Sequence, residues 1–392
     1  MAEKLERLQA ELKPLSCRYD VVVANPPYMG SSNMNKWLAA WVKSKYKEVY
    51  RDLCTCFIRR GMSLTEDGGY EALITSDTCM YISSFEQIRK MVIDRTTIVT
   101  FIDTRGTNAH PDAFDANAGW VLWNHHSENV LGAYFKLNHP IAEKGERLLE
   151  ALANPDCGWF YRADAETFAV APSLPIAYWV NKRIWKAYEK ELTFADIGHP
   201  KVGMQTSNND KYLRLWWEIS HGECSSNEMP PIWIKYLKGG DYRKWYGNLD
   251  YLLHYKKDPS YILKQPHAKV LDLAYLQKPK CTWTDLTSGE PSFRYAPEDT
   301  FYDISGHCFF PNRKDQLFLL AYANSSIVAM LKKVFNSSFH FQCGDLAKII
   351  VPSFSSKGRK HIETISREQI EASKTDWDSF ETSWDFKRHP LV

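Results

Sequence analysis

The stretch YDVVVANPPY, residues 19–28, constrains the fold more than any other part of the chain. Its apolar run has the length of one strand, and two prolines end it, because proline lacks an amide hydrogen and fixes φ. Strands that alternate with helical segments are typical of an α/β sheet. In open parallel sheets ligands bind beyond the carboxyl ends of the strands, and Asn25, Pro26, Pro27 and Tyr28 follow such an end.

Residues 1–150 alternate short apolar strands with helical patterns. The spacing of apolar residues predicts a helix over 52–65 that stops at Gly68-Gly69, and a strand over 70–76. A serine-capped helix over 83–94 and a strand over 98–104 are expected next, with GWVLWN and GAYFKL as an antiparallel pair. We therefore expect an α/β fold, the C-terminal half of a doubly wound, Rossmann-like sheet.

The composition changes after residue 150. Residues 151–192 predict a helical connector, and residues 193–355 are richer in Trp, Tyr, Gly and Lys, with short strand-like segments. This second stretch predicts a separate, β-rich α+β domain. Residues 356–392 are polar and predict a docking helix with a tail.

Charge is distributed unevenly, although the net charge is only +2. Residues 201–360 contain 22 Lys and Arg against 15 Asp and Glu, while the rest contains 27 against 32. This excess indicates a module that faces a polyanion, and a solvated face is the alternative explanation. No apolar run reaches the roughly 18 residues of a membrane span. The charged N-terminus is not a secretory signal, and scattered cysteines without CxxC spacing indicate a cytoplasmic chain without a zinc site.

The residue types after the first strand suit a flat ring that carries an amino group. The amide oxygen of Asn25 and the carbonyl of Pro26 are placed to accept the two hydrogens of an exocyclic amine. Pro27 stiffens the loop. Tyr28 offers a ring face on which a base can stack, a contact worth about 1–3 kcal/mol.

The run VVVANPPY resembles motif IV, the catalytic motif of S-adenosylmethionine-dependent amino methyltransferases. DLCTCFIRRGMSLTEDGGYEALITSDTCMYISSFEQIR and RGTNAHPDAFDANAGWVLW resemble later blocks of large adenine methyltransferases, and nearly the whole chain is similar to the PglX family of BREX phage defence. The resemblance implies methyl transfer to adenine N6, with the base flipped out, held by Asn25 and Pro26 and stacked on Tyr28. A chance Pro-Pro turn is the alternative.

One feature of that family is missing from the sequence. Its Gly-rich cofactor loop precedes motif IV, whereas here about twenty residues come first and no Gly-x-Gly follows a strand. We therefore expect a fragment or one part of a split enzyme. An upstream methyltransferase half, or other proteins of the defence system, would then be partners, and the site for S-adenosylmethionine cannot be assigned to residues of this chain.

Two loops of the predicted second domain combine basic and polar side chains: QTSNNDKYLR and KGGDYRKWYGN. Lysine and arginine neutralise phosphates, and polar side chains read base edges. The residues that we expect to contact double-stranded DNA are Gln205, Thr206, Asn208, Asn209, Lys211, Arg214, Lys238, Arg243, Lys244 and Arg294. Single tryptophans of this segment are expected to be structural, because aromatic residues usually fill cores.

The sequence therefore predicts a site-specific DNA adenine-N6 methyltransferase, present as its catalytic loop and target recognition domain. The alternative from another class is a non-catalytic module that recognises DNA or binds a partner in a defence complex. A protein-glutamine methyltransferase shares the Asn-Pro-Pro-Tyr loop, but it has no evident use for the basic, aromatic segment downstream.

Overall fold

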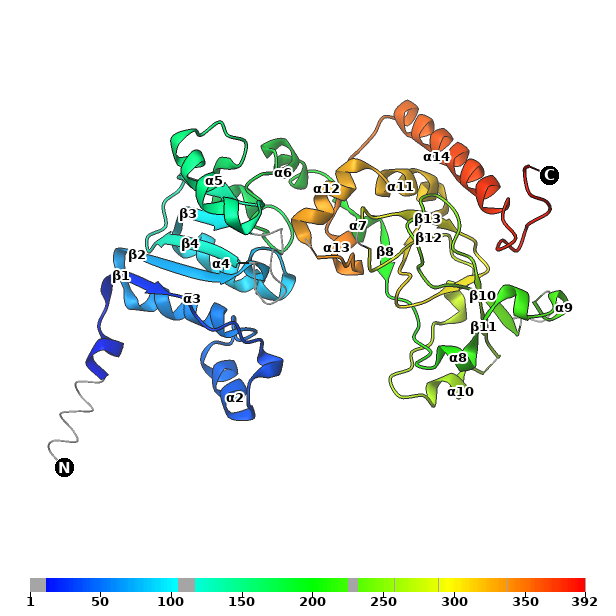
Figure 1. The fold of residues 1–392 in the computed structure, drawn as a ribbon, viewed down its shortest axis with the longest axis horizontal. Coiled ribbons are helices and arrows are strands. Elements are labelled where there is room, and N and C mark those ends of the chain that lie inside the picture. The colour runs from blue at the N-terminus through cyan, green and yellow to red at the C-terminus, as the bar shows by residue number, and fades with distance from the viewer. Residues whose placement is uncertain are drawn as a thin grey trace. The chain divides into compact units, whose positions relative to one another are not determined.

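The computed structural model describes residues 12–104, 117–224, 232–256, 258–287, 289–336 and 338–391 (Figure 1). Within these ranges the protein is mixed α/β with several sheets. The chain divides into two compact units, Met1–Glu189 and Lys190–Val392, and the division falls inside the predicted connector. The segment RGTNAHPDAFDA, residues 105–116, on which part of the family resemblance rests, lies outside the described residues.

The first unit is built on a six-stranded sheet in the order β1-β2-β4-β3-β5-β6. β1 and β2 run parallel, as do β3 and β5, and the other neighbours are antiparallel. The strands are β1 (Tyr19–Ala24), β2 (Thr65–Ser76), β3 (Thr97–Asp103), β4 (Asn117–Trp123), β5 (Leu131–Lys136) and β6 (Phe160–Asp164).

The predicted pairing of GWVLWN with GAYFKL is wrong. β4 lies between β2 and β3, and β5 instead pairs in parallel with β3. Ala118, Trp120 and Leu122 alternate as buried residues along β4, which fits a central strand. Strands that follow each other in the sequence need not pair in the sheet, because any strand with a matching apolar pattern can lie beside a given strand.

Besides helical residues 12–16, this unit contains α2 (Lys36–Lys45), α3 (Leu53–Leu64), α4 (Glu86–Arg95), α5 (Ile141–Ala153) and α6 (Lys182–Tyr188). The predicted helix over 52–65 is confirmed, with Asp52 accepting a hydrogen bond from the amide of Cys54 at 2.9 Å. The predicted serine cap is wrong: Ser83 opens a short 3-10 turn, and Phe85 takes the N-cap position of α4 without a side-chain cap.

The two glycines predicted to stop α3 lie inside β2 instead. Gly68 has a φ of +81°, a conformation that favours glycine. At Gly69 a Cβ atom would come within 2.6 Å of the carbonyl oxygen of Asp20, so only glycine allows β1 to approach this closely. The pairing of β1 with β2 is irregular between Tyr19 and Val21.

Aromatic side chains pack together in the core of the first unit. Phe101 lies edge-on to Trp120 at 4.8 Å between ring centroids, and Tyr134 stacks on Tyr178 at 4.8 Å. Fully burying such side chains contributes about 1.5–3 kcal/mol each. The buried Arg89 guanidinium donates to the carbonyls of Cys79, Ile82 and Ser173 and so joins α4 to two distant loops. The strand ends are therefore held by a packed core.

The second unit contains two four-stranded sheets, β14-β10-β11-β9 and β13-β12-β15-β8, and a two-stranded sheet, β16-β7. The prediction of short strands in this part of the chain is confirmed. The strands are β7 (Leu192–Thr193), β8 (Gly198–Lys201), β9 (Leu213–Leu215), β10 (Trp233–Leu237), β11 (Tyr251–His254), β12 (Lys280–Trp283), β13 (Phe293–Ala296), β14 (Thr300–Tyr302), β15 (Cys308–Pro311) and β16 (Ile350–Val351). Tyr236, Phe301 and Tyr302 belong to the buried core between them.

The helices of the second unit are α7 (Phe194–Ile197), α8 (Asn209–Tyr212), α9 (His221–Cys224), α10 (Ser260–Leu263), α11 (Gln316–Ala323), α12 (Ser326–Phe335), α13 (Cys343–Ala347) and α14 (Ser356–Trp377). Among the described residues no single helix has the length and apolarity to cross a membrane. The segments Arg313–Ala323 and Ser326–Phe335 have the required length and apolarity only when they are taken together, and the chain bends by 77° between them.

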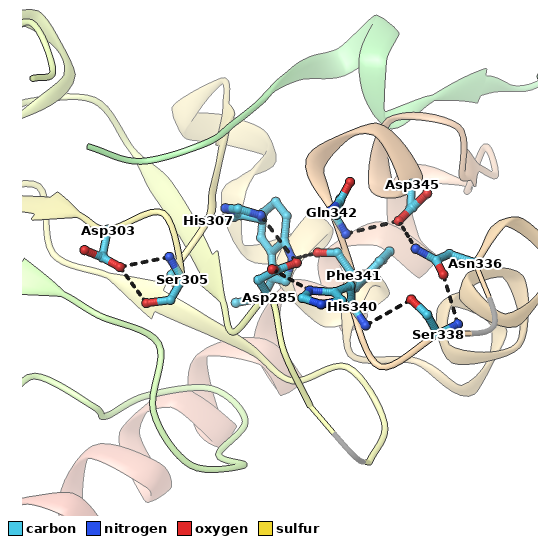
Figure 2. A network of polar contacts seen from close by, with 12 residues as sticks. Asp285, Asp303, Ser305, His307, Asn336, Ser338, His340, Phe341, Gln342 and Asp345 are labelled. Atoms are coloured by element: carbon cyan, nitrogen blue, oxygen red, sulfur yellow. Dashed lines mark hydrogen bonds and ion pairs between the residues drawn. The ribbon is translucent and has the colours of Figure 1, made fainter. Parts of the chain in front are cut away.

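Polar contacts fasten the end of β12 to the segment between α12 and α13 (Figure 2). His340 Nδ1 lies 2.8 Å from Asp285 Oδ2, and His307 approaches the other oxygen of this carboxylate at 3.6 Å. Asp345 accepts from the side chain of Asn336 at 2.8 Å and from the amide of Gln342 at 3.1 Å. These side chains therefore serve the architecture of the second unit.

Candidate functional site

The four residues predicted to carry chemistry directly follow β1. Pro26 is buried, Tyr28 is half-buried, and Asn25 and Pro27 are exposed. The Tyr28 hydroxyl donates to the carbonyl of Ile74 on β2 at 3.2 Å and lies 3.5 Å from Asn25 Oδ1. The loop is therefore tied to the neighbouring strand, while the Asn25 side chain remains accessible.

The groups of this loop are suited to holding a ligand and not to moving protons. Burial raises the pKa of the Tyr28 phenol above its usual range, and the nearby thiols of Cys54 and Cys79 raise it further. Tyr28 therefore stays a neutral hydrogen-bond donor near pH 7. The Asn25 amide does not titrate. An amine held here would be oriented by neutral acceptors.

A shallow apolar groove of about 270 Å³ lies beside Asn25 and is lined by residues of β1, β2, β3 and β4. Val23 is 73% exposed and Ile74 is 47% exposed along it. Within the described residues β1 pairs only with β2, so its other edge is open. An open edge beside an exposed apolar sheet face is a surface that proteins normally cover.

The first predicted DNA loop uses several of its polar groups to hold its own shape. Thr206 is buried and donates to Asn209 at 2.7 Å, and Asn208 caps α8 by accepting from the amide of Lys211 at 3.1 Å. Arg214 donates to the carbonyl of Asp210 at 2.7 Å. The exposed members of the predicted set in this loop are Asn208, Asn209 and Lys211, whereas Gln205 and Arg214 are half-buried.

The second predicted loop is engaged by the C-terminal segment. Arg243 pairs with Asp376 at 2.8 Å, and its guanidinium lies 5.0 Å from the ring centroid of Trp377. Lys244 donates to the carbonyl of Asn324 at 3.2 Å, and Lys238 lies over a tyrosine ring. All three basic side chains are half-buried. They form hydrogen bonds or ring contacts inside the second unit.

Arg294 does not lie on the surface where a phosphate contact was expected. It is 1% exposed, and its guanidinium donates to the carbonyl of Arg243 at 3.1 Å and to the hydroxyl of Thr284 at 3.1 Å. Burial lowers its pKa to about 10. The sequence could not reveal this position, because a buried arginine and an exposed one look alike in composition.

The two predicted loops lie at opposite ends of one sheet. β9 begins opposite Leu253 and ends opposite Tyr251, the residue that also faces Tyr236 near the end of β10. The loop at 205–212 therefore enters at one end, and the loop at 238–248 leaves at the other. The sequence did not indicate whether the two loops form one continuous DNA-contacting surface.

One basic residue near the first loop was missed by the sequence analysis. Lys256 follows β11. Partial burial is the main reason why the pKa of His254 lies below its usual value, and the charges of Lys256 and Arg214 lower this pKa further. Exposed Lys211 flanks the same strands. The HYKK run after a strand is the signal that would have indicated this cluster.

The comparisons with known proteins first indicate the class of protein that this chain resembles. Residues 4–109 match the family model described as the Eco57I restriction-modification methylase. This match includes β1, the candidate loop and β2. Relatives along nearly the whole chain are adenine-specific methyltransferases, so the resemblance expected from the sequence is confirmed.

Two curated relatives make the comparison specific. The adenine-specific methyltransferase BrxX of Escherichia coli O9:H4 (strain HS) is 30% identical over 387 residues, which cover 96% of this chain and 31% of the relative. The adenine-specific methyltransferase PglX of Lacticaseibacillus casei (strain Zhang) is 28% identical over 398 residues, or 97% of this chain and 33% of the relative. The chain thus spans about a third of the length of the curated relatives it matches.

Solved structures share the fold across the described parts. The Type IIL restriction-modification enzyme MmeI, solved in complex with DNA, gives a TM-score of 0.60 at 10% identity, covering 98% of this chain and 53% of that protein. A nuclease-deletion mutant of the Type ISP enzyme LlaGI, in complex with a DNA substrate mimic, gives 0.52 at 12% identity, covering 94% and 42%. At these identities the likeness concerns the fold.

The glycines of the first unit bear on whether this chain can hold S-adenosylmethionine. A nucleoside cofactor needs a Gly-rich turn from a strand into a helix, whose backbone amides face the ligand. In the described residues the glycine pair of this unit, Gly68 and Gly69, is inside β2 and not at such a turn. These residues do not fit the cofactor by themselves, and no chemical step is assigned through it.

Proposed function

We propose that this protein contributes the base-holding loop and the target recognition domain of a site-specific DNA adenine-N6 methyltransferase of PglX type. The observation that carries the proposal is the loop from Asn25 to Tyr28, fixed at the carboxyl end of β1 with an accessible amide. Similarity to adenine-specific methyltransferases over 96% of the chain supports it.

In the proposed complex an adenine leaves the duplex and enters this loop. Its amino hydrogens bond to Asn25 Oδ1 and to the Pro26 carbonyl, which frees the nitrogen lone pair for attack. The weak contact between the Tyr28 hydroxyl and Asn25, 3.5 Å long, would give way to the base. Tyr28 would then stack on the ring. S-adenosylmethionine, the methyl donor of the family, would be held by the additional segment proposed next, and residues of this chain take no step at it.

We further propose that another methyltransferase segment completes the sheet at β1 and holds the cofactor. Val21 and Val23 are 56% and 73% exposed on this edge strand, and the apolar groove beside Asn25 continues the same surface. Covering such residues would stabilise the complex by about 25 cal/mol per Å² of apolar surface. Residues 1–150 would be the catalytic part, 151–192 a connector, 193–355 the target recognition domain and 356–392 a helical tail.

We propose that the second unit binds double-stranded DNA through exposed Lys211 and Lys256, half-buried Arg214 and the loop amides. Lys211, Arg214 and Lys256 would contact phosphates. Asn208 and Asn209 would face base edges, which is where sequence is read. Arg294 is not included, because its guanidinium is buried.

To test this proposal, the protein is expressed from its native locus, and N6-methyladenine in genomic DNA is measured by mass spectrometry. Asn25→Ala is expected to lower methylation at least about 100-fold, as loss of one preorganised polar contact does in other enzymes. Asn33→Ala, in the turn that follows the loop, is the matched control and should leave methylation unchanged. Full methylation by the Asn25 variant would refute the assignment of the loop.

A non-catalytic DNA-recognition or partner-binding module is the second candidate, favoured by the poor fit of the described residues to the cofactor. Calorimetry separates the two in the assembled complex. A recognition module would show salt-dependent DNA binding and no heat with S-adenosylmethionine.

A further inference from the structure

The segment between the candidate loop and α3 forms a separate lobe whose two ends meet beside Tyr28. Gly30 and Asp52 form an isolated antiparallel bridge, and the amide of Met29 donates to the Asp52 carboxylate at 3.2 Å. The amide of Ser31 donates to the carbonyl of Arg51 at 2.8 Å. Figure 1 shows α2 of this lobe projecting away from the sheet. Whatever the lobe binds is therefore brought next to the candidate loop.

One side of α2 is packed and the other side is unusually apolar for an exposed helix. Asn35 caps the helix by accepting from the amide of Leu38 at 2.8 Å, and Val42 on the packed side is 0% exposed. On the opposite side Trp37 is 73% exposed and Trp41 is 42% exposed. Their rings are nearly parallel, 10° apart in plane with centroids separated by 6.4 Å. Trp41 also meets the Tyr46 ring edge-on, with the centroids 5.8 Å apart.

The same lobe is strongly basic. Residues 31–51 contain a single acid, Glu48, and five exposed cations, none of which has an ion-pair partner in the described parts of the chain: Lys36, Lys43, Lys45, Lys47 and Arg51. At about 100° per residue, Lys45 lies about 60° from the centre of the tryptophan pair on one side, and Lys36 and Lys43 lie about 120° and about 140° from it on the other. Planar rings between cations match a ligand with flat groups on an anionic backbone.

We propose that α2 is a second nucleic-acid contact of this protein, one that binds unpaired DNA next to the base-holding loop. Trp37 and Trp41 stack on exposed bases, Lys45 and Lys36 bind the nearest phosphates, and Lys43, farther round the helix, binds the backbone as it leaves the rings. The role rests on the proposed function, because extruding one adenine unstacks its neighbours and exposes their faces. A protein surface could cover the tryptophans, but it would not account for the unpaired cations on both sides of them.

The experiment titrates the full chain into a fluorescein-labelled single-stranded 20-mer of mixed sequence, with the matching duplex in parallel, at 50–200 mM NaCl. Trp37→Ala/Trp41→Ala is expected to weaken single-strand binding about 30-fold, the lower range for losing two stacked bases. The slope of log K against log salt should not change. Lys36→Gln/Lys43→Gln/Lys45→Gln should instead reduce that slope by about 2.

A matched control removes three cations from another helix of the same unit. Lys182→Gln/Arg183→Gln/Lys186→Gln on α6 changes the net charge equally and should leave the slope unchanged. An equal loss of slope in this control would overturn the proposal, because the effect would then be one of overall charge. Thermal unfolding of each variant confirms that the exposed substitutions preserve the fold.

Two further outcomes would also overturn it. Unchanged DNA affinity of the tryptophan variant, with an altered sedimentation coefficient, would identify the pair as a protein contact. Equal weakening of duplex and single-strand binding by that variant would remove the role of unpaired bases. The assay contains no methyl donor, so the proposed methylation can fail without changing its result, and the two proposals are tested separately.

Discussion

Both units bury charged side chains, but they satisfy them in different ways. In the first unit Arg89 is held by backbone carbonyls, whereas Glu71 on β2 is 1% exposed and neither of its carboxyl oxygens has a hydrogen-bond partner among the described residues. The second unit buries bases: Lys280 and Arg294 are 0% and 1% exposed. The Lys280 ammonium lies within 2.8–3.2 Å of four backbone carbonyl oxygens, which take the place of a carboxylate partner.

The difference shows how a charge count can mislead. Two of the cations that make residues 201–360 basic are internal hydrogen-bond donors, so they cannot meet a phosphate. Glu71 is accommodated because α3 carries Gly61, where any Cβ atom would overlap its carboxyl group. Desolvation raises the pKa of Glu71 to about 9 and lowers that of Lys280 to about 8. The acid is therefore neutral near pH 7, while the base remains largely charged.

The largest expected effect is the loss of the buried ammonium. Lys280→Met should destabilise the second unit by about 4 kcal/mol, because several buried carbonyl groups lose their donor. Chemical denaturation followed by tryptophan fluorescence measures this change. Lys264→Met, an exposed lysine of the same unit, should stay within about 0.5 kcal/mol. Equal stability of the two variants would show that the carbonyl cluster does not need the ammonium.

A smaller, pH-dependent effect is expected for the buried acid. Because the folded pKa of Glu71 lies above its usual value, its contribution to stability is full below about pH 4.5 and is lost as pH rises toward 9. Glu71→Gln should match the parent near pH 4.5 and exceed it by about 3 kcal/mol at pH 7. Denaturation at both pH values checks this. A stability gain that is independent of pH would contradict the assigned ionisation.

The smallest effect separates the cations of the first loop from fully buried Arg294. Lys211→Gln/Arg214→Gln should weaken duplex DNA binding and reduce the salt slope by about 2, since two phosphate contacts are lost. Arg294→Gln should leave the slope unchanged and lower the unfolding temperature, because its guanidinium holds the loop at Arg243. Anisotropy titrations and thermal melts measure both. The reverse pattern would mean that the second unit opens to bind DNA.

Much of the first unit was predictable because its signals are local. A strand ended by two prolines fixes which residues leave its carboxyl end, and the helix over 52–65 carries its own capping aspartate and apolar face. The four residues of the candidate loop are consecutive, so the chain itself brings them together. Their tertiary contacts, such as the bond from Tyr28 to Ile74, refine the loop without choosing its members.

By itself, the sequence determined the strand, the loop of Asn25 to Tyr28 and the adenine-methyltransferase resemblance. Only the tertiary structure decided that β4 lies between β2 and β3, that Arg294 is internal, and that Trp37 and Trp41 stay exposed. The physical reason is the distance along the chain over which each interaction acts. Proline geometry and capping act between neighbouring residues, whereas burial and strand pairing depend on segments far apart in the chain, whose packing no local pattern specifies.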